Sequence, residues 1–273
     1  MLAVLFLTID TIPNHGYWKQ WRGDNNNIRF YVNAKDPTMK TPEGFLRLPQ
    51  DQEVHNTAWG HFSLVLAHQA LLRYALADFP SAKWFVLVSG DALPLKSVST
   101  LFNRLKPNIS MFDEYVDSEQ HQQWGVMNEA LLRCDFPNWW VDVAAYRGED
   151  DKGSFCVFPE TYCPCVSQFH ILCHEHAQLI ADMPPEIPKD FDALIELVGG
   201  VRFSLAADEV VPLAYLRYIG KDDNVRMESV MHAPIDPKSP QHVAAHKTPV
   251  QCSHLFGRKY PWVVKPQTND KFG

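Results

Sequence analysis

The chain has 273 residues, of which 46% are hydrophobic and 12% aromatic, so it can bury a large core as one large domain or two modest ones. Its formal net charge of −7 lacks the positive field that non-specific binding to nucleic acids or anionic membranes requires. We therefore discount DNA, RNA and membrane surfaces as partners.

The first residues of the chain are predicted to form a buried strand. The first eight residues are apolar over too short a stretch to span a bilayer, and they show neither a basic segment nor a small-residue cleavage site. No later segment reaches ~18 uninterrupted apolar residues, so we expect no transmembrane helix. Without an export signal we expect a cytoplasmic protein whose six cysteines are mostly reduced. The sequence leaves the oligomeric state open.

The N-terminal half alternates short apolar strands with helices. In chain order, the predicted elements are strands over 2–8 and 28–32, a helix over 57–76 capped by Asn56 or Thr57, a strand over 84–88, a helix over 95–105 capped by Ser97 or Ser99, and a strand over 108–112. This alternation predicts an α/β fold with a mostly parallel, Rossmann-like sheet, whose ligand sites lie at the carboxyl ends of the strands.

The C-terminal half is less regular. We expect irregular loops with short elements from about 119 to 164, then helices over 167–181, 191–198 and 208–218, and a tail from Pro234 rich in Pro, His and Lys. No internal repeat or low-complexity linker divides the chain. We therefore expect a single domain.

An acidic pair, Asp208-Glu209, opens an apolar helix after a turn of small residues. The helix dipole favours acidic side chains in a first turn, so a capping role explains the pair without any function. Alternatively, a carboxylate here would deprotonate an acceptor hydroxyl, which must lie within hydrogen-bond reach.

Two further clusters suit a sugar nucleotide. Arg258 and Lys259 lie in an aromatic, apolar run, and fixed cations stabilise the charge that builds on a departing diphosphate. A solvated basic turn is the alternative. Ser89-Gly90-Asp91 follows a predicted strand; its glycine permits close approach of a ligand, and Asp91 suits a ribose, a sugar hydroxyl or a metal. Such turns are also common without function.

Several blocks occur in one order along the chain: Thr57-Ala58-Trp59-Gly60-His61-Phe62-Ser63, Phe85-Val86-Leu87-Val88-Ser89-Gly90, Leu93-Pro94-Leu95, Ser167-Gln168-Phe169, Asp208-Glu209 and Leu255-Phe256-Gly257-Arg258-Lys259-Tyr260. Together they resemble the core-2/I-branching N-acetylglucosaminyltransferase and xylosyltransferase family. The resemblance implies a GT-A fold, a UDP-sugar donor, a glycan acceptor, inversion at the anomeric carbon and no obligatory metal or other cofactor. Xylose or N-acetylglucosamine is then the expected sugar.

The resemblance also assigns roles to residues. Glu209 takes the position of the catalytic base, and Lys259 that of the diphosphate-binding lysine, with Arg258 beside it. The resemblance divides the domain into a nucleotide-binding half, 1–115, and an acceptor-binding half, 116–273, which carries the base and the diphosphate-binding tail. The remaining candidates are Asn33, Trp59, Gly60, Ser63, Ser89, Gly90 and Asp91 for the nucleotide sugar, and Gln168 and Asp208 for the acceptor.

The chain departs from the family pattern in two ways. Ala92 stands at the usual position of an aspartate, and the acid is one residue earlier, at Asp91, in the part of the pattern that bears on sugar selectivity. Relatives are usually anchored in the secretory pathway and disulfide-bonded, whereas this chain begins directly at its first strand. A bacterial or viral cytoplasmic enzyme would suit that pattern.

Two alternatives involve a metal. A zinc site is suggested by His170 and His174, four apart on the predicted helix, together with Cys163, Cys165, Cys173 and His176. Their spacing matches no standard zinc pattern, so core and surface roles are favoured. Asp91, or Asp113-Glu114 after another strand, would hold Mn or Mg in a metal-dependent glycosyltransferase.

Two alternatives without sugar transfer also remain. The many tryptophans suit a noncatalytic carbohydrate-binding protein, although such a protein would not need Glu209, Arg258 and Lys259 at one site. A glycoside hydrolase requires two carboxylates that flank the scissile bond, and the sequence nominates no such pair.

Overall fold

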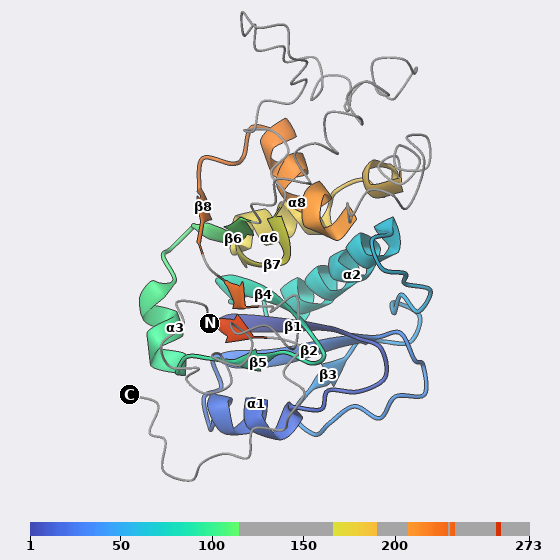
Figure 1. Ribbon diagram of the computed structural model, residues 1–273, viewed down its shortest axis with the longest axis vertical. Helices are drawn as coiled ribbons and strands as arrows, with labels where there is room; N and C mark the ends of the chain where they lie inside the picture. Colours follow the sequence, from blue (N-terminus) through green and yellow to red (C-terminus); the bar gives the residue numbers. More distant parts are fainter. Residues whose placement is uncertain (115–165, 190–206, 229, 233–254, 258–273) are drawn as a thin grey trace, which may run out of the picture.

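The computed structural model describes residues 1–114, 166–189, 207–228, 230–232 and 255–257. Within these residues, one seven-stranded sheet has the order β3-β2-β1-β4-β7-β6-β8, and a small sheet has the order β5-β10-β9 (Figure 1). The large sheet comprises β1 (Leu2–Thr8), β2 (Ile28–Ala34), β3 (Leu46–Arg47), β4 (Trp84–Ser89), β6 (Ser110–Glu114), β7 (Val166–Cys173) and β8 (Val225–Met227). The small sheet comprises β5 (Leu93–Pro94), β9 (Met231–His232) and β10 (Phe256–Gly257). The helices are α1 (His15–Arg22), α2 (Phe62–Asp78), α3 (Val98–Arg104), α6 (His174–Ala181) and α8 (Ala207–Tyr218).

The large sheet is mixed. The first four strands in its order, β3, β2, β1 and β4, are all parallel to one another. Strand β7 is antiparallel to both of its neighbours, β4 and β6, and β8 pairs with β6 in parallel. The predicted α/β architecture with flanking helices is confirmed. Three of the four adjacent parallel strands, β1, β2 and β4, were expected from the sequence, whereas the two-residue strand β3 was not.

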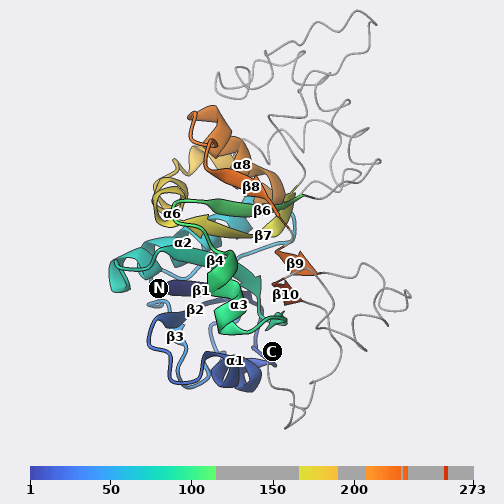
Figure 2. The ribbon, with the colours of Figure 1, turned by 90° about the vertical axis from the view of Figure 1, so that its left-hand side faces the viewer.

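Each face of the sheet is covered by its own set of helices. Successive side chains of a strand point to opposite faces, so Val4 and Phe6 of β1 pack with α1 and α3, whereas Leu5 packs with α2, α6 and α8. A sheet buried on both faces explains why β1 is a continuous apolar run in the sequence. Figures 1 and 2 show α1 near the β2 and β3 edge of the sheet and α8 near the β6 and β8 edge.

The predicted helix over 167–181 is wrong in its first half. Residues 166–173 form β7, and the helix α6 begins only at His174. Strand β7 pairs with β4 on one side and β6 on the other, and Phe169 to Cys173 are all buried. Pairing on both sides outweighs an apolar spacing that also suits a helix, because such short runs are ambiguous by periodicity alone. His170 and His174 therefore do not share a helix face.

Other predicted boundaries shift for local reasons. Helix α2 begins at Phe62 rather than near residue 57, because Gly60 has φ +74° and His61 is extended. The His61 side chain, rather than Asn56 or Thr57, caps this helix by accepting from the Ser63 N–H. Ser97 caps α3 as predicted, although α3 begins at Val98 because Leu93–Pro94 forms β5.

Several predictions fall outside the described residues. These are the irregular region over 119–164, the helix over 191–198 and nearly all of the tail from Pro234. The helix predicted over 208–218 is confirmed as α8, which begins one residue earlier.

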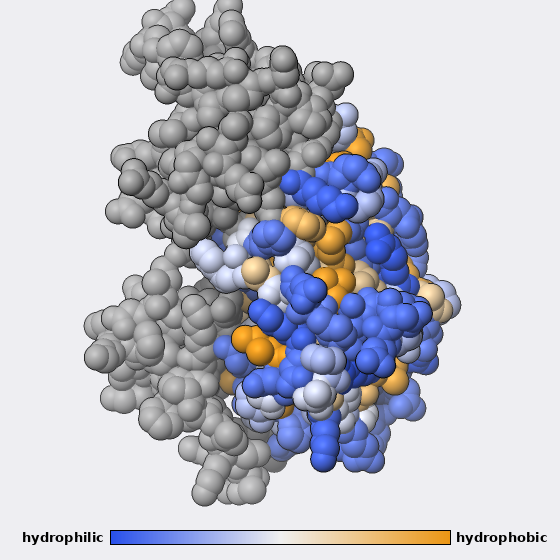
Figure 3. Space-filling model, turned by 90° about the vertical axis from the view of Figure 1, so that its right-hand side faces the viewer, coloured by the Kyte–Doolittle hydropathy of each residue, from blue (hydrophilic) through white to orange (hydrophobic). Residues whose placement is uncertain are grey.

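One face of the described part is largely polar. On the face in Figure 3, hydrophilic residues dominate and apolar residues occur in small separate groups. Among the described helices, none combines the length and apolarity that a membrane crossing demands.

Candidate active site

The carboxyl ends of three parallel strands meet at one edge of the sheet. Leu7 of β1 is paired both with Asn33 of β2 and with Ser89 of β4. Just beyond this level, the Lys35 N–H donates to the Thr8 carbonyl at 2.9 Å, and the Gly90 N–H donates to the Leu7 carbonyl at 2.9 Å. The structure therefore brings Asn33 and the Ser89-Gly90-Asp91 turn together at the edge where α/β sheets bind ligands.

Helix α1 and Asn14, the residue before it, hold the turn after β4 through hydrogen bonds to its carbonyl groups. Asn14 Nδ2 donates to the Asp91 carbonyl at 3.0 Å, and Trp18 Nε1 donates to the Ala92 carbonyl at 2.8 Å. The Ser89 hydroxyl donates to the Asp91 carboxylate. Ala92, which stands where the family usually has an aspartate, is fully buried in the core. Ser89 and Asp91 are thus the polar side chains that this turn offers to a ligand.

Gly90 is required by the packing of this turn. A Cβ atom at this position would lie 2.2 Å from Thr8 Oγ1 and 2.8 Å from the Thr11 carbonyl oxygen. We expect Gly90→Ala to lower the free energy of unfolding by about 1–3 kcal/mol, because the backbone must shift to relieve the overlap. Chemical denaturation measures this loss. Gly16→Ala is the matched control, since a Cβ there would meet no atom within 4 Å apart from its chain neighbours and the backbone of its own helix, and an equal loss in both variants would contradict the packing argument.

The turn before α2 joins the predicted donor site to the helix that carries Glu209. Lys35 Nζ donates to the Thr57 carbonyl at 2.7 Å, and the Ala207 N–H at the start of α8 donates to the Gly60 carbonyl at 3.0 Å. Trp59 lies between these two contacts with 71% of its surface exposed. Trp59-Gly60 and Asp208-Glu209, which are far apart in the sequence, are therefore neighbours in the fold. The sequence prediction did not assign Lys35, although a lysine directly after a strand was an available signal.

Two predicted donor residues support the protein's own loops. Ser63 is buried, and its Oγ accepts from the Ala58 N–H at 3.1 Å and lies 2.9 Å from His61 Nδ1. Asn33 is also buried, and its amide both donates to the Val54 carbonyl at 3.1 Å and accepts from the Val54 N–H at 2.9 Å. A contact of either side chain with a nucleotide stays a prediction.

The acidic pair and Gln168 come from adjacent elements. Glu209 is half-buried in the first turn of α8, where the helix dipole favours a negative charge, and Asp208 beside it is buried. Helix α8 packs against β7, on which Gln168 is half-buried. The residues assigned to the base and to the acceptor thus lie on packed neighbouring elements.

The small sheet connects the C-terminal block to the turn after β4. Gly257 of β10 is paired with Leu93 of β5, two residues after Asp91, and the Leu95 N–H donates to the Leu255 carbonyl at 2.9 Å. Figure 2 shows β9 and β10 on the side toward which β1 runs from the N-terminus. Arg258 and Lys259 follow Gly257 in the sequence but lie outside the described residues.

Asp113 binds the backbone of β9. Its Oδ2 accepts from the Met231 N–H at 2.8 Å. Burial raises the pKa of this carboxyl to about 6, and the backbone groups of Met231 and Val230 oppose that rise. Among the described residues, no group of three or more His, Cys, Asp and Glu side chains is placed to hold a metal ion.

The histidines of the suspected zinc cluster have separate contacts. His170 is buried on β7 and stacks on Phe112 at 4.8 Å between ring centroids; burial lowers its pKa well below the usual value. His174 Nδ1 lies 2.8 Å from the Ala82 carbonyl oxygen, to which only a protonated nitrogen can donate, and His176 Nδ1 lies 2.8 Å from Ser110 Oγ. Cys163 and Cys165 lie outside the described residues. The shared helix face that motivated the zinc hypothesis is absent.

The chain is similar to several solved glycosyltransferase structures at low identity. A glycosyltransferase involved in the glycosylation of the major capsid of PBCV-1 is 10% identical with a TM-score of 0.40, over 96% of this chain and 94% of that chain. The galactosyltransferase LgtC in complex with donor and acceptor sugar analogues is 10% identical with a TM-score of 0.45, over 99% and 90%. Mouse xyloside xylosyltransferase 1 is 8% identical with a TM-score of 0.42, over 96% and 98%. A search of curated proteins found no match.

A family-level comparison is more specific. The sequence model of the Core-2/I-Branching enzymes matches residues 2–138, which is half of the chain. The matched region includes β1, β2 and β4, whose carboxyl ends meet at the predicted donor edge of the sheet, as well as the Trp59-Gly60 turn and the Ser89-Gly90-Asp91 turn. The chain therefore belongs to the Core-2/I-Branching enzyme family.

Proposed function

We propose that this glycosyltransferase moves a sugar from a UDP-sugar to a hydroxyl of a glycan acceptor in a single displacement that inverts the anomeric centre. Glu209 accepts the proton of the attacking hydroxyl, and Lys259 with Arg258 stabilises the departing UDP. The reaction needs no metal ion. Xylose and N-acetylglucosamine are the sugars that we propose first.

The contact between Gly60 and Ala207 carries this proposal. A general base acts only within hydrogen-bond reach of the proton that it removes, so the base and the donor must share one site. The hydrogen bond from the Ala207 N–H to the Gly60 carbonyl holds the first turn of α8 against the turn that carries Trp59. Glu209 is two residues from that bond, and its position in the first helical turn favours the ionised carboxylate that a base requires.

The pairing of β5 with β10 supports the role of the cations. This pairing places Gly257 opposite Leu93, close in sequence to Ser89-Gly90-Asp91 at the carboxyl edge of the sheet. Positive charge held there would face the diphosphate of a nucleotide bound at that edge, where it stabilises the charge of the leaving group. Arg258 and Lys259 directly follow Gly257.

Two other functions have an observation in their favour. Asp91 lies at the strand end with its carboxylate fixed by Ser89, which suits a metal-dependent transferase. The exposed Trp59 suits a protein that binds a carbohydrate without reacting it.

A UDP-release assay tests the proposal. Purified protein is incubated with a panel of UDP-sugars and glycan acceptors, with and without EDTA, and the anomeric configuration of the product is determined by NMR. We expect turnover of one UDP-sugar that resists the chelator and inverts the configuration. Loss of activity with EDTA and recovery with manganese would favour the metal-dependent alternative through Asp91, and binding of glycan without turnover would favour the noncatalytic one.

A further inference from the structure

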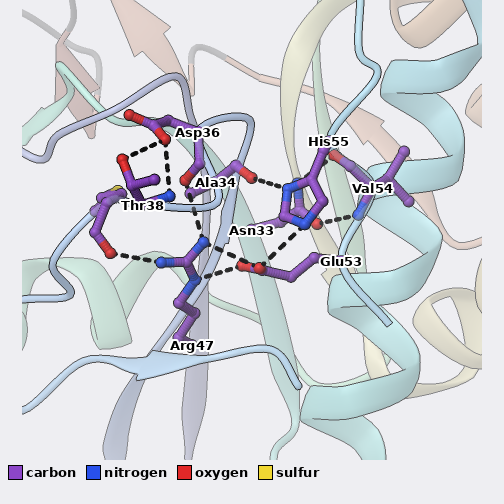
Figure 4. Close-up of polar contacts among 9 residues, drawn as sticks. Asn33, Ala34, Asp36, Thr38, Arg47, Glu53, Val54 and His55 are labelled. Atoms are coloured by element: carbon purple, nitrogen blue, oxygen red, sulfur yellow. Dashed lines mark hydrogen bonds and ion pairs between the residues drawn. The ribbon is translucent and has the colours of Figure 1, made fainter. Parts of the chain in front are cut away.

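Three consecutive residues at the end of β2 hold the loop that precedes α2. The Asn33 amide binds both backbone groups of Val54, as described above. The Ala34 carbonyl accepts from His55 Nδ1 at 3.0 Å, and Lys35 Nζ donates to the Thr57 carbonyl at 2.7 Å. Val54, His55 and Thr57 are therefore held along the strand end, and Figure 4 shows the contacts of Val54 and His55.

A buried ion pair anchors the same loop to β3. Arg47 Nε and Nη2 donate to the two carboxylate oxygens of Glu53 at 2.7 and 3.0 Å, and the Glu53 side chain is only 1% exposed. The guanidinium also donates to the carbonyls of Asp36 and Met39, and His55 Nε2 lies 3.6 Å from Glu53 Oε2 (Figure 4). One guanidinium thus joins the loop after β2 to the loop before α2. We call the five side chains that make these contacts the β2 clamp: Asn33, Lys35, Arg47, Glu53 and His55.

The loop has no apolar anchor of its own. All residues from 49 to 62 are described, and none of them is buried as a whole residue. A segment with few buried apolar contacts is held mainly by its polar contacts and opens locally when these are removed. The β2 clamp therefore contributes to the position of Trp59 and Gly60, together with the hydrogen bond of the Ala58 N–H to Ser63 Oγ and that of the Ala207 N–H to the Gly60 carbonyl.

We propose that Arg47 and Glu53 are positioning residues of the donor site, an inference that rests on the proposed function. Their ion pair holds 53–57 on the end of β2 and thereby sets the Trp59-Gly60 turn between the donor edge and the first turn of α8. Neither residue needs to touch the substrate. A buried ion pair is a weak source of stability in itself, because the cost of removing both charges from water offsets their attraction. Its geometric precision, two parallel hydrogen bonds, is what such a pair supplies.

The Glu53→Gln variant tests this inference with little change of shape. A glutamine amide nitrogen cannot accept from a guanidinium N–H, so one of the two hydrogen bonds is replaced by two facing donors. Because the loosened loop is then in its binding-competent position for only a fraction of the time, we expect UDP to bind about tenfold more weakly. Isothermal titration calorimetry measures this change, and amide hydrogen exchange over 53–61 should become faster. Arg47→Lys keeps the positive charge but removes the planar guanidinium that makes two parallel hydrogen bonds. We expect it to weaken UDP binding and speed amide exchange as Glu53→Gln does.

An ion pair at the other end of the same strand provides the control. Arg29 near the start of β2 binds Asp78 at 2.8 Å, and Tyr31 also donates to Asp78 at 2.7 Å. Asp78→Asn is expected to leave the affinity for UDP and the exchange over 53–61 unchanged. A wild-type protein that does not bind UDP would overturn the proposed function and this inference together. Wild-type binding that persists equally in Glu53→Gln and Arg47→Lys would overturn the inference alone, as would an equal loss in Asp78→Asn.

Discussion

The Glu209→Gln variant is expected to turn over at least about 100-fold more slowly than the wild type while it binds UDP almost as tightly. The amide has nearly the same shape as the carboxylate but cannot take the proton of the attacking hydroxyl. Glu209 lies in the first turn of α8, whose backbone contacts the Trp59-Gly60 turn through Ala207. Steady-state kinetics with the preferred UDP-sugar, together with titration of UDP, separate the loss of kcat from a loss of binding.

A glutamate on another helix provides the matched control. Glu175 lies in the first turn of α6 and pairs with Lys221 at 3.1 Å, with about half of its side chain exposed. Glu175→Gln makes the same chemical change in a first helical turn and is expected to keep wild-type kcat. Unchanged turnover in Glu209→Gln would remove this residue from the base position and return the acidic pair to a capping role.

Removing the charge of Lys259 should weaken UDP binding and turnover together. A charged hydrogen bond to phosphate contributes about 1.5–3 kcal/mol, so Lys259→Ala is expected to reduce the affinity for UDP by about tenfold to a hundredfold. The fall in kcat adds to this loss, because the charge on the diphosphate grows as the sugar departs. Gly257, which precedes Arg258 and Lys259 in the sequence, is paired with Leu93, two residues after Asp91. Calorimetry with UDP and steady-state kinetics measure the two effects.

Lys221→Ala is the comparison for Lys259→Ala. Lys221 follows α8, is half exposed and pairs with Glu175, so its removal changes the net charge equally without changing the donor edge. We expect it to bind UDP like the wild type. If Lys259→Ala matched it, the diphosphate would be held by other residues.

The sequence predicts strands β1, β2 and β4 well because each has a recognisable apolar pattern. Strand β1 has the predicted bounds, and β2 and β4 begin at the predicted residues Ile28 and Trp84. These strands are buried on both faces, so each is a short apolar run between polar residues. The helix over 62–78 is also recovered, because its apolar spacing is long enough to be unambiguous.

Strand β7 shows where local pattern fails. Its sequence, Val166 to Cys173, is apolar enough for either a helix or a strand. Its pairing with β4 and β6 depends on tertiary structure and cannot be inferred from the spacing of apolar residues. The site shows the same limit. Asp91 and Asn33 could be placed at strand ends from the sequence. The ion pair of Arg47 and Glu53 joins two loops, and no sequence motif indicates it. The contact of Gly60 with Ala207 likewise cannot be predicted from the sequence, because it joins two segments that only the fold brings together.

The central position of β7 also dictates when the protein can fold during synthesis. Trp84 on β4 is paired with Cys173 on β7. The edge of β4 that faces away from β1 therefore stays unpaired until β7, in the second half of the chain, has been synthesised. An exposed strand edge is a template for pairing with other chains. The nascent N-terminal half therefore depends on timely arrival of β7, and pairings of such long sequence separation form slowly.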